Sequence, residues 1–360
     1  MPPIFYFQRL VTLWPTATLM LLCFLFFSAR TSAAVWVAVG ENGTIINSTD
    51  GLTWSGATSA TSETLRGVYF DGVGTWAAAG QQGTVVNSPD AAVWTQQTSG
   101  NTSPLWGTVF AGGQWIVSGG SGRVITSPDS DVWTSVNGSF SFTLYDIAYD
   151  GSGLYVIAGG DSGAKAIILT SNDAVTWTQQ PPQPSNAESF YGISYGANEW
   201  VAVGDAGTIR TSADPEARAW AIQTSGTSAN LRDIVYNGTD LYVVVGVGGV
   251  ILTSADARAW TPRNSGLGTD IDLVGVEYDG TGLYVAVGTD GTILSSNDGI
   301  SWTPQISPII QNLRDVAVGK SSPSPPLSPA SIPTLPLPLL VLLSLLMAST
   351  GVIVFRRKNA

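Results

Sequence analysis

Residues 292–302 read TILSSNDGISW, and variants of this short stretch recur along the chain. Its core is the pattern Ser-x-Asp-x-x-x-Trp, formed here by Ser296, Asp298 and Trp302 after a run of apolar residues. We call this pattern the SDW turn. An Asp carboxylate can accept hydrogen bonds from the N–H groups of a tight turn, Ser can assist, and a Trp ring can cover the turn. The stretch therefore predicts a strand that ends in a stabilised turn.

Seven SDW turns divide the chain at nearly regular intervals. Their Asp and Trp residues are Asp50 and Trp54, Asp90 and Trp94, Asp129 and Trp133, Asp173 and Trp177, Asp214 and Trp220, Asp256 and Trp260, and Asp298 and Trp302. The fifth copy carries two extra residues around Pro215. Successive Trp residues are 40, 39, 44, 43, 40 and 42 positions apart, the length of a four-stranded blade. We predict an all-β, seven-bladed β-propeller over residues 35–320.

The two ends of this repeat array complement each other. An aromatic residue opens one strand in every copy: Trp36, Trp76, Trp115, Tyr155, Trp200, Tyr242 and Tyr284. The first copy begins at Val35 and has no leading strand, whereas Leu313-Arg314-Asp315-Val316 follows the last copy with no blade to join. We predict that this C-terminal strand joins the first blade, because closing the ring removes an open sheet edge.

Composition limits the chemistry of the propeller. The chain has no His, and its single cysteine, Cys23, precedes the repeats. The propeller therefore cannot use His- or Cys-ligated zinc, copper or haem, a Ser-His-Asp or Cys-His site, or a disulfide. We predict no cofactor and no metal site. Residues 35–320 hold 26 acidic residues against ten Lys and Arg, a net charge of −16, which disfavours nucleic acid as a partner.

Both ends of the chain resemble targeting segments. Arg9, an apolar run over residues 10–27 and a stretch of small residues predict a signal peptide over residues 1–34, cleaved after Ala34. An uncleaved anchor is the alternative. Residues 321–338 are rich in Ser and Pro and predict an extended spacer. The apolar residues 339–355 predict a transmembrane helix, and the basic tail 356–360 places that end in the cytoplasm.

The C-terminal segment resembles the IPTL-type sorting signal of Gram-negative bacteria. Ile332, Pro333, Thr334 and Leu335 supply the tetrapeptide, and the apolar helix and basic end follow in the expected order. The resemblance implies recognition by an exosortase-like membrane protease. The Trp-Gly pair that usually follows the tetrapeptide is replaced by Pro336-Leu337-Pro338. A permanent membrane anchor is therefore the alternative to tail processing.

Over residues 35–319 the repeat resembles the Asp-box (BNR) repeats of sialidases and of the photosystem II stability and assembly factor family. The resemblance implies a propeller, and the lack of catalytic signatures makes the second group the closer match. A sialidase would need several Arg, a Tyr-Glu pair, an acid/base Asp and an Arg-Ile-Pro motif, and that motif is absent. The best carboxylate cluster is Asp270, Asp272 and Glu277. Exposed loop acids are its alternative interpretation, and we predict no catalytic residue.

One position of the repeat varies in a way that suggests binding. The second residue of the leading strand is, in blade order, Arg66, Trp106, Tyr145, Tyr191, Arg232, Val274 and Arg314. We expect this strand to be innermost, so these side chains would surround one mouth of the central channel. Arg and aromatic residues are typical of protein and carbohydrate interfaces. Alternatively, they pack between blades or pair with Asp233 and Asp315.

These features favour a non-enzymatic, exported binding module whose partner is a protein or an envelope polysaccharide. Two alternatives stay open. One is a carbohydrate-binding or glycoside-hydrolysing propeller, which would need a deep pocket with paired carboxylates. The other is an assembly factor for a membrane complex, which rests on the family resemblance alone.

Overall fold

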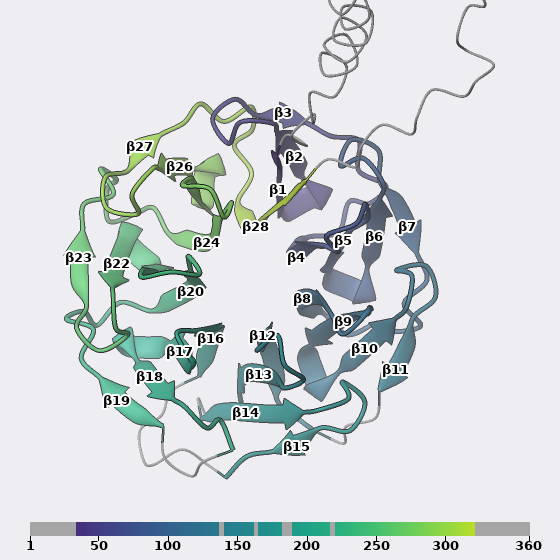
Figure 1. Cartoon of the computed structure of the whole chain (residues 1–360). Coiled ribbons are helices and arrows are strands. Elements are labelled where there is room, and N and C mark those ends of the chain that lie inside the picture. The colour runs from purple at the N-terminus through teal and green to yellow at the C-terminus, as the bar shows by residue number, and fades with distance from the viewer. Residues whose placement is uncertain (1–33, 137–139, 162–164, 182–188, 217–219, 321–360) are drawn as a thin grey trace, which may run out of the picture. The chain divides into compact units, whose positions relative to one another are not determined.

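A computed structural model describes residues 34–136, 140–161, 165–181, 189–216 and 220–320 of the chain. These residues form seven four-stranded antiparallel sheets arranged as a ring (Figure 1). The predicted all-β seven-bladed propeller is confirmed. The predicted spacer, transmembrane helix and basic tail, and the signal peptide up to residue 33, lie outside the described residues. Within the described part, no helix is long and apolar enough to cross a membrane.

The first four blades contain β1 to β15 and the C-terminal strand. Their strands, from the centre outward, are β28 (Leu313–Lys320), β1 (Ala34–Gly40), β2 (Ile45–Ser48) and β3 (Ser55–Gly56) in blade 1; β4 (Leu65–Phe70), β5 (Trp76–Gly80), β6 (Val85–Ser88) and β7 (Thr95–Gln97) in blade 2; β8 (Leu105–Ala111), β9 (Gln114–Gly119), β10 (Val124–Ser127) and β11 (Thr134–Val136) in blade 3; and β12 (Thr143–Tyr149), β13 (Tyr155–Gly160), β14 (Ala166–Ser171) and β15 (Thr178–Gln179) in blade 4.

The remaining three blades repeat the same order. They are β16 (Phe190–Gly196), β17 (Glu199–Gly204), β18 (Ile209–Ser212) and β19 (Ala221–Gln223) in blade 5; β20 (Leu231–Tyr236), β21 (Tyr242–Gly246), β22 (Val250–Ser254) and β23 (Thr261–Arg263) in blade 6; and β24 (Leu273–Tyr278), β25 (Tyr284–Gly288), β26 (Ile293–Ser296) and β27 (Thr303–Pro304) in blade 7. Short 3-10 turns join second and third strands: η1 (Glu41–Gly43), η2 (Gln81–Gly83), η3 (Gly120–Gly122), η4 (Asp205–Gly207), η5 (Val247–Gly249) and η6 (Thr289–Gly291).

The closing blade forms as predicted. β28 runs antiparallel to β1 from the pair Ala34 and Lys320 to the pair Gly40 and Leu313. It therefore completes a sheet with three strands from the other end of the described chain. In Figure 1 the yellow-green β28 lies beside the purple β1.

The ring has two distinct faces because every blade follows the same path. The innermost strands are β4, β8, β12, β16, β20, β24 and β28, and they all run in the same direction through the ring. They begin at the face that carries the 3-10 turns and end at the face that carries the SDW turns. We call these the collar face and the SDW face. Since Ala34 pairs with Lys320, at the end of β28, the described chain enters and leaves at the SDW face.

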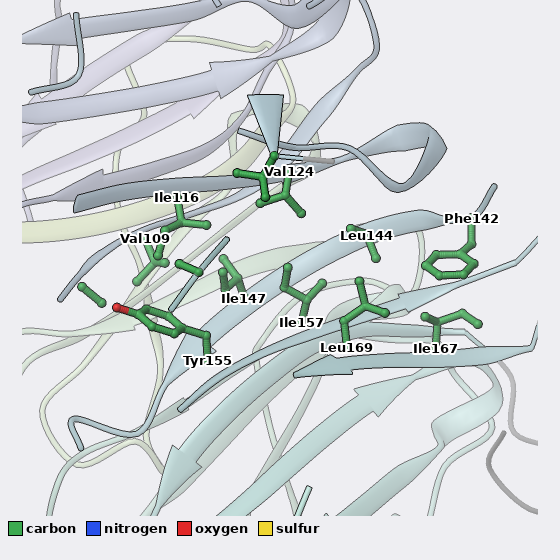
Figure 2. Packing of buried hydrophobic residues seen from close by; sticks show 13 residues of the cluster. Val109, Ile116, Val124, Phe142, Leu144, Ile147, Tyr155, Ile157, Ile167 and Leu169 are labelled. Atoms are coloured by element: carbon green, nitrogen blue, oxygen red, sulfur yellow. The ribbon is translucent and has the colours of Figure 1, made fainter. Parts of the chain in front are cut away.

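Seven apolar clusters, one at each junction between neighbouring blades, hold the ring together. Figure 2 shows the junction of blades 3 and 4, where Ile116 and Val109 of blade 3 face Ile147, Ile157 and Leu169 of blade 4. Successive side chains of a strand point to opposite faces of its sheet, so each blade packs against both neighbouring blades. The predicted strand-opening aromatics lie in this core and are at most 4% exposed.

The SDW turns have the hydrogen bonds that the pattern predicts. In the last copy, the Oδ1 atom of Asp298 accepts the N–H groups of Ile300 and Ser301 at 2.8 and 2.7 Å, and the Ser296 hydroxyl donates to it. The Trp302 indole donates to the Gly299 carbonyl at 3.1 Å. Gly299 has φ of 68°, a conformation that glycine adopts without strain.

The fifth SDW turn differs because Pro215 stands where Gly299 stands in the last copy. Proline cannot adopt a positive φ, so the chain takes a longer path. The Ser212 hydroxyl donates to the backbone carbonyl of Asp214, and the Trp220 indole donates to the Pro215 carbonyl at 3.4 Å. Trp220 therefore stays buried, although its turn differs from that of the other copies.

Replacing Asp298 by Ala should lower the free energy of unfolding by about 1–2 kcal/mol, because two turn N–H groups lose their acceptor. The matched control is Asp270→Ala, which removes an exposed carboxylate and should stay within about 0.5 kcal/mol of the parent. Urea unfolding followed by Trp fluorescence measures both. Equal destabilisation by the two variants would contradict a structural role for the turn.

Candidate functional site

The structure brings the seven variable residues of the innermost strands together at the collar face. Six of them were our candidate binding residues and the seventh is Val274. All seven line one cavity of about 250 Å³ at the channel mouth: Arg66, Trp106, Tyr145, Tyr191, Arg232, Val274 and Arg314. We call this set the collar. Each directly follows a fully buried residue, such as Leu65, near the start of its strand, and the repeat therefore points all of them toward the same opening.

Five collar residues touch one another in the order of their blades. The guanidinium carbon of Arg66 lies 3.8 Å from the centre of the Trp106 ring. Trp106 meets Tyr145 edge to face at 5.1 Å, and Tyr145 meets Tyr191 at 5.0 Å. The guanidinium carbon of Arg232 lies 4.6 Å from the Tyr191 ring centre. This unbroken arc spans blades 2 to 6 and orients each side chain before any partner arrives.

The remaining arginine closes the other side of the mouth. Arg314 of blade 1 forms a salt bridge with Glu41 of η1. Burial, and then the nearby charge of Arg314, lower the pKa of Arg66. Among the described residues the Nε atoms of Arg66 and Arg314 are both buried without a hydrogen-bond partner. The mouth thus holds two neighbouring cations with unused donors.

Three carboxylates form a second ring immediately below the collar. Asp146, Asp233 and Asp315 each follow a collar residue, and all three line the collar cavity and the adjoining channel. We call these three the waist. Each binds two backbone N–H groups: Asp315, for example, accepts from Val316 in its own strand and from Val68 in the next blade, both at 2.8 Å. The waist therefore clamps blades 1 to 2, 4 to 5 and 6 to 7.

Among the described residues, the collar arginines form no salt bridge with Asp233 or Asp315. The oxygens of these two carboxyl groups accept backbone N–H groups. Burial raises the pKa of Asp146 to about 7, with a smaller contribution from the charge of Asp233, and raises the pKa of Asp233 to about 6. The pKa of Asp315 also lies well above its usual range, again mainly through burial. The carboxyls are enclosed by protein yet reach the channel.

Sequence reasoning missed the waist, although a signal was present. The third residue of the innermost strand is Gly or Asp in every blade: Gly67, Gly107, Asp146, Gly192, Asp233, Gly275 and Asp315. Backbones approach closely here, since a Cβ on Gly67 would lie 2.0 Å from the Trp106 carbonyl oxygen. A position restricted to Gly and Asp indicates crowding on one side and hydrogen-bond donors on the other.

The predicted carboxylate cluster does not exist as one site. Asp270 is exposed in the loop before β24, and Asp272 lines the collar cavity and accepts the Gly248 N–H at 3.0 Å. Glu277 lines the opposite part of the channel. Asp272 and Glu277 are separated by five residues of extended chain, roughly 16 Å. The three acids therefore form no paired-carboxylate site, because Asp272 and Glu277 lie at opposite ends of β24.

Glu277 is nevertheless unusual, and the loop interpretation does not fit it either. Burial raises its pKa to about 8, with a smaller contribution from Asp233. Its Oε1 accepts the Tyr278 N–H at 2.8 Å. Across the closing strand, burial and the charge of Glu277 raise the pKa of Tyr69 to about 12. No group of three or more acidic, His or Cys side chains among the described residues could hold a metal ion.

The described residues thus form a seven-bladed β-propeller with the collar at one mouth of its channel. No protein-family model and no curated protein sequence matches the chain. Solved structures do match. YCF48 bound to D1 peptide has a TM-score of 0.54 at 16% identity, covering 68% of this chain and 81% of that one.

Two further structures are similar over most of their length. YCF48 from Cyanidioschyzon merolae has a TM-score of 0.56 at 14% identity, covering 74% of this chain and 97% of that one. The WD40 β-propeller domain of Doa1 has a TM-score of 0.58 at 12% identity, covering 79% and 94%. At these identities the likeness establishes the shared propeller fold.

Stability should pass through a maximum at mildly acidic pH. Asp146, Asp233 and Glu277 have folded-state pKa values of about 7, 6 and 8, above the unfolded values near 4, so the folded state binds more protons between those limits. Stability from these groups is therefore present at about pH 4 and lost as the pH rises toward 8. The SDW carboxylates act oppositely: hydrogen bonds lower the pKa of Asp173 to about 2, and their contribution is lost in acid.

Thermal melts between pH 3 and 9 measure this profile. Glu277→Gln should match the parent at pH 5, where Glu277 is protonated, and melt higher than the parent at pH 8 to 9, where the parent carries a buried charge. Glu216→Gln changes an exposed acid of the SDW face and should follow the parent throughout. A melting temperature that rises steadily from pH 5 to 9 would contradict the assigned shifts.

Proposed function

We propose that the chain is an exported, non-enzymatic binding module that recognises a protein partner through its collar. The observation that carries this proposal is the continuous arc from Arg66 through Trp106, Tyr145 and Tyr191 to Arg232 around one cavity. We assign no catalytic residue to it. Arg, Trp and Tyr are the residue types that dominate binding energy at protein interfaces.

The contacts within the collar support recognition rather than packing alone. Each large side chain is held by its neighbour, so little rotamer entropy is lost when a partner binds. The collar residues are also only partly buried, in contrast to the fully buried residues that precede them. The guanidinium groups of Arg66, Arg232 and Arg314, which line the cavity, favour a partner that presents carbonyl or carboxylate oxygens.

Export and tethering fit the direction of the ring. We propose that residues 1–34 direct export, that residues 321–360 attach the propeller to a membrane, and that Ile332 to Leu335 allow processing by an exosortase-like protease. β1 begins and β28 ends at the SDW face. An attachment at these ends would leave the collar, on the opposite face, accessible to a partner outside the cytoplasm.

A protein ligand has a structural parallel, and a glycan is the alternative. One of the similar propellers was solved with a D1 peptide bound, which supports a peptide or protein partner and keeps a role in assembling a membrane complex as a variant of the proposal. The three aromatic rings in the cavity wall favour the second candidate, a carbohydrate partner, because sugars stack on such rings. The Asp-box resemblance to sialidases points the same way.

Alanine replacement of Arg66, Arg232 and Arg314 together should reduce capture of the partner at least tenfold, because removal of interface arginines each costs about 1 kcal/mol or more. The tagged full-length chain is used to capture proteins from cell-envelope fractions, and bound proteins are quantified by mass spectrometry. The control replaces Arg123, Arg258 and Arg263 by alanine, which removes the same charge outside the collar.

A partner lost with the collar variant and kept with the control supports the proposal. A partner kept by both variants would exclude the collar as the recognition surface. If the folded chain captures no protein but binds envelope glycans in a collar-dependent way, the carbohydrate alternative replaces the protein one.

A further inference from the structure

The part of the channel between the waist and the SDW face is a second, separate cavity system. A cavity of about 300 Å³ lies directly below the waist and is lined by Asp146, Asp233, Asp315 and Glu277. It shares Tyr69 and Glu277 with a cavity of about 630 Å³ that opens beside Ala34 and Asp279 at the SDW face. Among the described residues, neither lining contains Lys or Arg. The lower channel is therefore lined by acids that no cation of the linings opposes.

The residues around its opening carry the same sign of charge. The turns between first and second strands lie nearest the channel at this face, and they carry Asp71, Asp150, Asp240 and Asp279 with no Lys or Arg. The SDW turns lie farther out, between third and fourth strands. Among the side chains of the SDW turns that the structure describes, the single cation is Arg258, which is paired with Glu199 at 2.8 Å. A channel mouth with one sign of charge attracts ligands of the other sign.

A hydroxyl group without a partner also lies beside this space. The Thr108 hydroxyl is buried and has no hydrogen-bond partner among the described residues, and Thr108 lines both the collar cavity and the lower channel. It lies at the junction of blades 2 and 3, where Gly67 stands in place of a clamping Asp. Buried polar groups are normally hydrogen-bonded, so Thr108 is a candidate contact for a molecule bound in the channel.

The carboxyl groups lie at two levels whose spacing suits a short linear diamine. Gly275 marks the waist level on β24, because Val276 donates its N–H to Asp233 and a Cβ on Gly275 would lie 3.0 Å from the Asp315 Cα. Glu277 follows two residues later, roughly 7 Å along the strand. The nitrogens of extended 1,4-diaminobutane are about 6 Å apart, given ordinary bond lengths.

We propose that the lower channel binds a linear aliphatic di- or polyamine, with one ammonium group at the waist and the next at Glu277. Each ammonium supplies three donors and a charge to carboxyl groups that lack a cation. The methylene chain lies against the apolar parts of the innermost strands, including Val235 and Ala148. This site lies on the other side of the waist from the collar.

Binding should release protons at neutral pH, which gives the proposal its own signature. The carboxyls that face the ligand are Asp146, Asp233, Asp315 and Glu277, and Tyr69 faces it from β4. Burial holds the pKa of each of these four acids above its ordinary value. An ammonium group lowers them again, so protons leave as the amine enters.

Titration calorimetry of the full-length chain with 1,4-diaminobutane at pH 7 tests the proposal. We expect saturable binding at least tenfold tighter than that of butylamine, with a heat that depends on the ionisation enthalpy of the buffer. Glu277→Gln should weaken diamine binding at least fivefold, whereas the matched change Glu216→Gln on the same face should have no effect. Thermal melts at pH 5 verify that both variants are folded.

Several outcomes would overturn the proposal. Equal affinity of the parent and Glu277→Gln, or an equal response to Mg²⁺ at the same charge concentration, would reduce the effect to general screening of an acidic surface. Tighter binding of N-acetyl-lysine amide than of diaminobutane would assign the site to a protein side chain instead of a free diamine. The Arg66, Arg232 and Arg314 alanine variant should bind diamine at least as tightly as the parent, because it removes positive charge near the waist, so that failure of the collar proposal and failure of this one are distinguishable.

Discussion

The pairing of β28 with β1 is the constraint on which the rest of the structure depends. It joins residues 313–320 to residues 34–40, the two ends of the described chain, and it alone gives blade 1 an innermost strand. Arg314 and Asp315 lie on that strand. Without it the collar would lack the arginine beside Arg66, and the waist would lack the carboxylate that holds Val68. The pairing of β28 with β1 therefore closes the fold and completes the site at once. Because the paired strands are far apart in the chain, bringing them together costs conformational entropy.

Close packing around the channel explains why fold and chemistry overlap there. Where a neighbouring backbone comes within contact distance, only Gly fits, as at Gly67 and Gly275. Where a free N–H group faces the gap, Asp fills it, as Asp233 does for Val276. The ring thereby acquires buried carboxyl groups for structural reasons, at the cost of desolvating them. A positive charge that a ligand brings to the waist would offset that cost.

The sequence was sufficient for features that repeat and insufficient for features that depend on neighbours. Seven SDW turns and a left-over strand predicted the blades, the ring and its closure, because a repeat fixes a local structure wherever it occurs. The same logic placed Arg66 and Arg314 at one mouth. It did not place Asp272 and Glu277 correctly, because residues five positions apart in an extended strand lie roughly 16 Å from each other. It also could not foresee that Asp315 reaches into the next blade, since that bond depends on the distance between two sheets.

The two ends of the channel differ in charge in a way that separates their roles. At the collar, three arginines are accompanied by Glu41, Asp205 and Asp272, which favours recognition by shape and hydrogen bonding. Around the channel at the SDW face, the turns between first and second strands carry acids without Lys or Arg, which favours recognition of positive charge. The waist lies between them and belongs to both cavities. A cation bound below it would reduce the negative potential that the collar arginines experience from Asp315 and Asp233. Occupation of the lower channel would then strengthen the collar for oxygen-rich partners, which couples two sites through three carboxylates without any movement of the ring.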